Sequence, residues 1–149
     1  MRETIAQALK DALKSKDKLR TGTLRLVNAA IQDRDIANRG AGKDPVGDDE
    51  ILQILTKMVK QREESAKAFE EGGRIELAEQ ERAEIAIIKE YLPSQLGEDE
   101  VRRAAQAAVA ETGAAGLRDM GRVMAVLKER YPGRMDFSRA SAIVKELLG

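Results

Sequence analysis

The chain has 149 residues, a formal net charge of zero, and aromatic side chains at only 3% of its positions. It contains no cysteine and no histidine, which excludes disulfides, thiolate or imidazole metal ligands and any Ser–His or Cys–His catalytic pair. The composition, in which Ala, Glu, Lys, Leu and Arg are prominent, favours helices and offers few residues suited to strands. We therefore expect an all-α protein with no metal, no cofactor and no catalytic residues.

The first residues lead directly into an amphipathic pattern and not into the apolar core of a signal peptide. No apolar run reaches the roughly 18 residues that a membrane span needs. The sequence therefore predicts a cytoplasmic location and no membrane partner.

The charges are segregated along the chain although their sum is zero. Residues 1–43 carry ten basic and five acidic side chains, and residues 44–92 carry seven and thirteen. Residues 114–149 carry seven basic and four acidic side chains. Because a basic segment can bind nucleic acid even in a neutral protein, this pattern keeps RNA among the possible partners.

Two helices are predicted before residue 39. The first covers residues 2–15, and the second continues to about residue 38 with a narrow apolar stripe that includes Leu24, Val27, Ala30 and Ile31. The basic cluster at their junction has three interpretations: a solvated face, a complement to the acidic segment that follows, or an RNA contact. Its members are Lys14, Lys16, Lys18, Arg20 and Arg25.

A loop rich in glycine follows over residues 39–47, and Asp48 is predicted to cap the next helix. Gly42 and Lys43 resemble the end of a phosphate-binding loop. Ala37 replaces the required first glycine, however, and the segment follows a helix and not a strand. We interpret it as a linker.

Residues 48–92 form a long helical hairpin in our interpretation, with its turn at Gly72 and Gly73. Apolar residues recur at helical spacing on both arms, and the second stripe begins at Leu77. A turn between residues 72 and 73 places Arg62 opposite residue 83, within reach of Glu81 and Glu84. We predict a structural ion pair there. A catalytic use of the two carboxylates is the alternative.

Pro93 ends the hairpin, and we place a linker at residues 93–97 between an N-terminal domain (1–92) and a C-terminal domain (98–149). The first is expected to hold four helices with the long hairpin. The second is expected to be a small three-helix tail, with helices over residues 98–112, from about 118 to 131, and from a cap at Asp136 or Ser138 onward.

The tail carries the candidate nucleic-acid-binding residues. Gly121 provides a helix surface without a side chain beside Arg122, and its alternative role is close packing between helices. A structured RNA is bound by shape and backbone contacts, so few aromatic side chains are needed. The candidates are Arg118, Arg122, Lys128, Arg134 and Arg139.

Several short stretches, in order, give the chain a resemblance to the YqeY family. Among them are Lys57 to Arg62, Glu81 to Glu84 with Glu90 to Pro93, Asp119 to Met124, and Gly133 to Asp136. These proteins are similar to the C-terminal helical and tail region of GatB, a subunit of the glutamyl/aspartyl-tRNA amidotransferase. In that enzyme the related tail contacts tRNA. The catalytic part of GatB has no counterpart here.

The resemblance implies a tRNA-associated accessory or adaptor protein without a catalytic centre of its own. One alternative is a protein–protein module that docks on an amidotransferase or synthetase subunit or on itself. A second is participation in carbon–nitrogen ligation with glutamine as the amide donor, which rests on family analogy alone. The sequence leaves the oligomeric state open.

Overall fold

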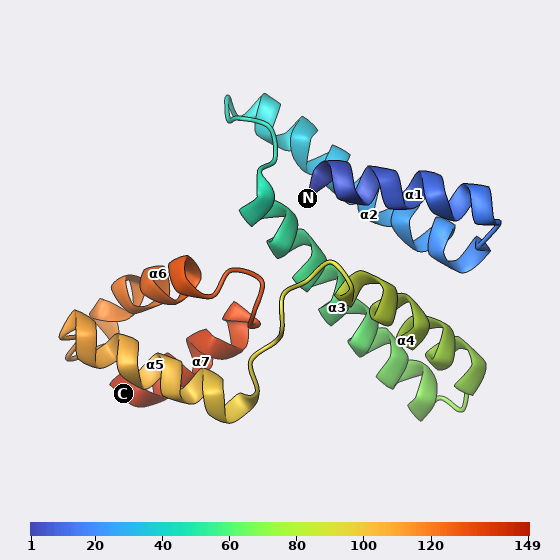
Figure 1. Ribbon diagram of the computed structural model, residues 1–149. Helices are drawn as coiled ribbons and strands as arrows, with labels where there is room; N and C mark the ends of the chain where they lie inside the picture. The colour runs from blue at the N-terminus through green and yellow to red at the C-terminus, as the bar shows by residue number, and fades with distance from the viewer. The chain divides into compact units, whose positions relative to one another are not determined.

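The computed structural model describes all 149 residues, and its regular secondary structure is entirely helical (Figure 1). The predicted all-α class is thus confirmed. No helix combines the length and the apolar character required to cross a bilayer. The helices are α1 (Arg2–Ser15), α2 (Lys18–Gly40), α3 (Asp48–Glu71), α4 (Ile75–Lys89), α5 (Glu98–Thr112), the 3₁₀ turn η1 (Leu117–Asp119), α6 (Met120–Arg130) and α7 (Phe137–Leu148).

The chain divides into two compact units, Met1–Leu92 and Pro93–Gly149. The first contains α1 to α4, and the second contains α5 to α7. Each unit buries its own cluster of apolar side chains, and the two clusters share no residue.

In the first unit α2 packs against α1 and also against α3 and α4. Its inward stripe is the predicted one, since Leu24, Val27 and Ile31 are buried, although Ala30 is only partly covered. The turn between α1 and α2 is closed by Asp17, whose carboxylate accepts the N–H of Arg20 at 3.0 Å and caps α2.

The hairpin of α3 and α4 turns at Gly73, where φ is +76° and a side chain would be strained. Two details differ from the sequence prediction. Gly47 and not Asp48 occupies the cap position of α3, so Asp48 instead contributes negative charge to the first helical turn. Ala78 is buried whereas Leu77 is exposed. Residue 78 lies two helical turns before the buried Ile85 and therefore on the same side of the helix.

Asp35 fixes the loop before α3. Its carboxylate accepts hydrogen bonds from both terminal nitrogens of Arg2, at 2.8 and 2.9 Å. It also accepts a hydrogen bond from the N–H of Val46 at 2.9 Å. Arg2 in turn donates to the carbonyl of Val46. The paired guanidinium, followed by the Val46 hydrogen bond, lowers the pKa of Asp35 to about 2. The contacts explain how a glycine-rich segment keeps Val46 buried.

In the second unit α5, α6 and α7 pack against one another around Val101, Ala105, Val123, Leu127 and Val144. Gly113 ends α5 with φ of +66°, and Asp136 caps α7 through the N–H of Ser138. The predicted linker is attached to this unit. The N–H of Leu96 donates to the carbonyl of Arg134 at 2.8 Å, and the amide of Gln95 donates to the carbonyl of Gly133.

Candidate functional site

The structure brings together Arg62 and Glu84 in the middle of the hairpin. Arg62 Nε lies 3.1 Å from Glu84 Oε2, and the two side chains are only 14% and 15% exposed. Arg62 also donates to the carbonyl of Met58, one turn earlier on α3. Neither a hydrogen bond nor an ion pair joins Glu81 to Arg62. Helical side chains lean toward the start of their helix, so in this antiparallel pair Arg62 reaches the later glutamate.

The five basic residues predicted in the tail fall into two groups. Arg134 and Arg139 contact the segment around the start of α5. Arg134 Nε donates to the carbonyl of Ser94 at 3.0 Å, and its guanidinium lies 5.9 Å from the centre of the Tyr131 ring. Arg139 is paired with Glu98. Arg134 thus contacts the predicted linker, and Arg139 contacts the first residue of α5 through a pair that is exposed on both sides.

The other three residues, Arg118, Arg122 and Lys128, lie on η1 and α6 together with two small residues. We call this surface, formed by Arg118, Gly121, Arg122, Ala125 and Lys128, the α6 outer face. All five residues are exposed, and they recur at helical spacing opposite the buried Val123 and Leu127. From residue 118 to residue 128 a helix rises about 15 Å.

Two of these cations, Arg118 and Lys128, make no ion pair. Arg122 contacts Asp119 at 2.7 Å, one turn earlier, and donates to the carbonyl of Thr112 at 3.4 Å, while its side chain stays 61% exposed. The pKa of Asp119 is lowered by the N–H of Ala115 and then by Arg122. Asp119 is only 17% exposed, whereas the guanidinium of Arg122 remains accessible to an anion from outside.

Gly121 does not serve packing inside the chain. A Cβ built at this position meets no atom within 4 Å. A glycine in a helix costs about 1 kcal/mol relative to alanine, and here no close helix contact offsets that cost. The surface around Gly121 is therefore open to a group from outside.

The basic cluster at the junction of α1 and α2 is only partly available. Arg20 binds Glu90 at 2.8 Å and Asp17 at 3.6 Å, which connects α2 to the end of α4. This contact matches the interpretation in which the cluster complements the acidic hairpin. Lys14, Lys16, Lys18 and Arg25 are exposed and form no ion pair.

Sequence reasoning missed a second apolar stripe on α2. The residues Leu19, Gly22, Leu26, Ala29, Asp33 and Ile36, which we call the α2 outer face, are all exposed. Their spacing alternates between three and four residues, which places them on one side of the helix. That spacing is visible in the sequence. The inward stripe was sufficient to predict the helix, so its other side was not considered.

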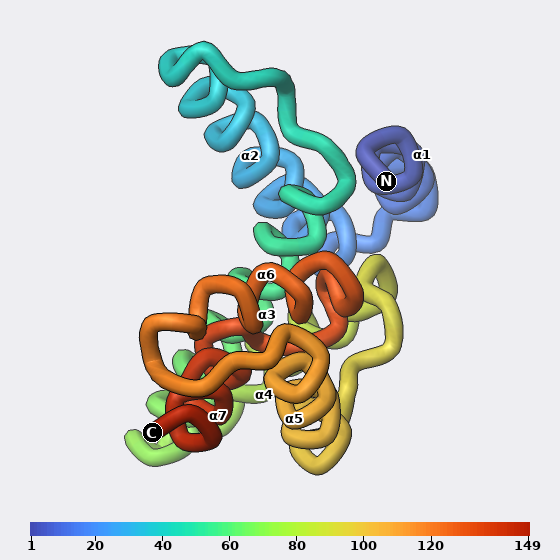
Figure 2. Tube along the Cα trace, turned by 90° about the vertical axis from the view of Figure 1, so that its left-hand side faces the viewer, coloured from blue at the N-terminus to red at the C-terminus, as the bar shows by residue number.

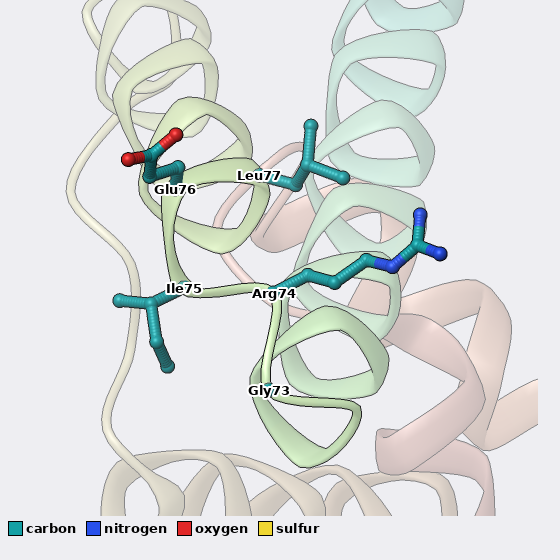
Figure 3. Close-up of a pocket in the computed structure, with 5 residues that line it drawn as sticks. All are labelled: Gly73, Arg74, Ile75, Glu76 and Leu77. Carbon is teal, nitrogen blue, oxygen red and sulfur yellow. The ribbon is translucent and has the colours of Figure 1, made fainter.

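An open hollow also lies at the turn of the hairpin, lined by residues 73–77. Figure 3 shows that Arg74 and Leu77 point toward α3, whereas Ile75 and Glu76 point away from it. Polar groups thus do not converge on one point there, as they do in a ligand site. No group of three acidic, histidine or cysteine side chains is arranged to hold a metal ion.

The chain is similar to several fungal proteins. It is 34% identical over 84 residues to the Lachancea thermotolerans protein named Altered inheritance of mitochondria protein 41, mitochondrial, covering 56% of this chain and 43% of that protein. A protein of the same name from Pyrenophora tritici-repentis is 28% identical over 95% of this chain and 77% of its own length. An uncharacterized Schizosaccharomyces pombe protein is 29% identical over 62% and 72%.

These relatives contradict the predicted cytoplasmic location. The Lachancea and Pyrenophora proteins are named as mitochondrial, and so are those of Candida glabrata and Clavispora lusitaniae. The prediction rested on the lack of an apolar leader at the start of the chain. An apolar leader is a signal of secretion, and its absence carries no information about mitochondria. The chain spans less than half of the Lachancea protein.

The family model for Yqey-like proteins matches residues 2–148. The match includes both compact units and each of the stretches on which the resemblance was based. The chain belongs to the YqeY family.

Proposed function

We propose that the chain is an RNA-associated accessory protein that binds tRNA through the α6 outer face and has no catalytic centre of its own. The open position of Gly121 among three exposed cations is the observation that carries this proposal. In this proposal the N-terminal four-helix domain supports a separate C-terminal three-helix domain, which makes the RNA contact.

The face fits a sugar–phosphate backbone better than base edges. Arginine and lysine bind phosphates, and such contacts position a protein without reading sequence. Gly121 and Ala125 allow the helix backbone to come close to the strand. No aromatic side chain lies on the face, so stacking of splayed bases is not expected. The choice of tRNA among structured RNAs rests on the resemblance to the GatB tail.

The proposal uses three of the five basic residues predicted in the tail. We choose Arg118, Arg122 and Lys128 because they share one helix face. Arg134 donates to the carbonyl of Ser94, and Arg139 is paired with Glu98. No residue of the α6 outer face specifically favours docking on an amidotransferase or carbon–nitrogen ligation.

A titration of labelled total tRNA at 50 and 200 mM salt tests the proposal. Three phosphate contacts predict roughly a 40-fold loss of affinity between these concentrations. The variant with Arg118→Ala and Lys128→Ala should bind more weakly and lose about two units from the slope of log affinity against log salt. Lys145→Ala, an exposed cation on α7, is the matched control and should leave both quantities unchanged.

A second variant tests the role of the open glycine. Gly121→Leu fills space that is empty in the free protein, so the fold should be kept while the RNA is held away from the helix. We expect weaker tRNA binding with an unchanged circular dichroism spectrum. Binding that is absent at micromolar protein, independent of salt, or equal in all variants would refute the proposal.

A further inference from the structure

The α2 outer face points to a second binding surface, in the other unit and independent of the RNA proposal. Leu26 is 50% exposed and Ile36 is 66% exposed, although α2 already buries Leu24, Val27 and Ile31 on its opposite side. A helix that is apolar on two sides ordinarily has neighbours on both. In Figure 2, α1 lies on one side of α2, and no helix of this unit covers its other side.

The spacing of the face defines what shape fits it. Leu19, Leu26 and Asp33 are seven residues apart, and so are Gly22, Ala29 and Ile36. These are the a and d positions of a heptad, which receive the side chains of a partner helix. A Cβ added at Gly22 would meet no atom within 4 Å, so a partner backbone can approach closely there. The stripe runs about 25 Å, or between four and five helical turns.

A groove adjoins the face on the α3 side. Its lining includes Ala30, Asp33 and Ala37 from α2, with Ile54 and Lys57 from α3. Asp33 belongs to both surfaces, so the groove and the stripe are continuous. Alanines on one wall leave room for the larger side chains of an incoming helix.

The charges beside the stripe define the chemistry of the partner. Lys18, Arg25 and Arg39 share one heptad position along one edge, and Lys57 lies on the groove side. All four are exposed and form no ion pair, and Asp33 is the one carboxylate on the face. A partner helix with acidic residues beside its apolar stripe complements this pattern, because edge charges select coiled-coil partners.

The same charges disfavour a second copy of the chain. An antiparallel pair of α2 helices would place Lys18 of one copy near Arg39 of the other. A parallel pair would place Asp33 against Asp33. Like charges in such positions are unfavourable. We therefore propose that the α2 outer face binds an amphipathic helix of a partner protein, with leucine or isoleucine at its a and d positions and acidic residues along its flanks.

Two synthetic helical peptides of 21 residues form the probe, both with leucine at every a and d position. One has glutamate at the flanking positions and the other has lysine. Nuclear magnetic resonance titration of the labelled full chain should show that the glutamate peptide shifts the signals of Leu19, Leu26 and Ile36. The lysine peptide should bind at least ten-fold more weakly.

Variants locate the contact and its charge preference. Leu26→Lys should weaken binding of the glutamate peptide at least ten-fold, since burial of a leucine is lost. Ile75→Lys, at an equally exposed position on α4, is the matched control and should bind normally. The double variant Lys18→Glu and Arg25→Glu should reverse the preference toward the lysine peptide.

Four results would overturn the inference. The first is that neither peptide shifts α2 at millimolar concentration, and the second is that both bind equally well. The third is a dimer in solution that Leu26→Lys dissociates, which would assign the face to a second copy. The fourth is binding to anionic vesicles that Leu26→Lys abolishes while neither peptide binds, which would assign the face to a lipid surface.

Discussion

At the residue scale, Arg62 and Glu84 form a largely buried ion pair between apolar layers of the hairpin. Such a pair is costly to break, because the remaining charge stays buried without a partner, whereas apolar residues of similar volume can replace both members with little loss. We regard it as structural.

Arg62→Ala should therefore lower the free energy of unfolding by roughly 2 kcal/mol, less than for a fully buried pair because both side chains retain some exposure. The double variant with Arg62→Met and Glu84→Leu should recover most of that loss. Urea denaturation followed by circular dichroism measures both. A double variant as unstable as the single one would show that the charges themselves are required. Glu81→Ala is the control with little expected effect.

Asp35 gives the first unit a predictable acid sensitivity. Its folded pKa of about 2 lies below the ordinary value of 3.8, so the folded state favours the charged form. The corresponding stability is fully present above about pH 4 and is lost as the pH falls toward 2.

The difference in free energy of unfolding between the wild type and Asp35→Asn should consequently shrink as the pH is lowered from 4 to 2. Arg2→Gln should show the same trend, because Arg2 is the main cause of the low pKa. Denaturant titrations at a series of pH values provide the measurement. Parallel curves for wild type and variants would contradict the prediction.

At the scale of single helices, α2 and α6 both carry a glycine that faces open space. Gly22 and Gly121 have ordinary helical backbones and no neighbour for a Cβ within 4 Å. Each weakens its helix without improving any contact inside the chain. In both binding proposals, therefore, a glycine that weakens its helix lies on an exposed surface.

Gly22→Ala and Gly121→Ala should each stabilise the protein by about 0.5–1 kcal/mol, since alanine restricts the unfolded chain and suits a helix. Gly113→Ala should do the opposite, because φ there is +66°. Thermal unfolding distinguishes these outcomes. A loss of stability in either helix variant would mean that the glycine meets a neighbour after all.

At the scale of the whole molecule, the two units bury separate clusters around Leu55 and Leu127. A mutation in one core should therefore loosen that unit first. Leu127→Ala leaves a cavity in the smaller unit, which has less buried surface to offset it.

In Leu127→Ala, hydrogen exchange should accelerate across α5 to α7 while the amides of α3 and α4 keep their protection. Leu55→Ala should give the reverse pattern. Mass spectrometry of peptide fragments resolves the two halves. Equal acceleration in both units would show that they unfold as one.

Features that depend on local chemistry can be predicted from the amino-acid sequence. The helical class follows from composition, and the ends of α1 and α5 follow from a left-handed residue or a glycine at the right place. The position of Arg62 opposite the two glutamates follows from the turn at Gly73, because helical rise is regular. The family resemblance likewise rests on short runs of residues and is confirmed by the match over residues 2–148.

Which polar side chains already have a hydrogen-bond or ion-pair partner depends on the folded arrangement of the helices. The partners of Arg134 and Arg139 lie 40 and 41 residues away, at Ser94 and Glu98, so no local pattern reveals these contacts. The same is true of Gly22 and Gly121, whose open surroundings depend on where other helices pack. It is equally true of the α2 stripe, which sequence cannot distinguish from a buried one. Burial and pairing are properties of contacts distant in sequence, and those contacts exist only once the chain is folded.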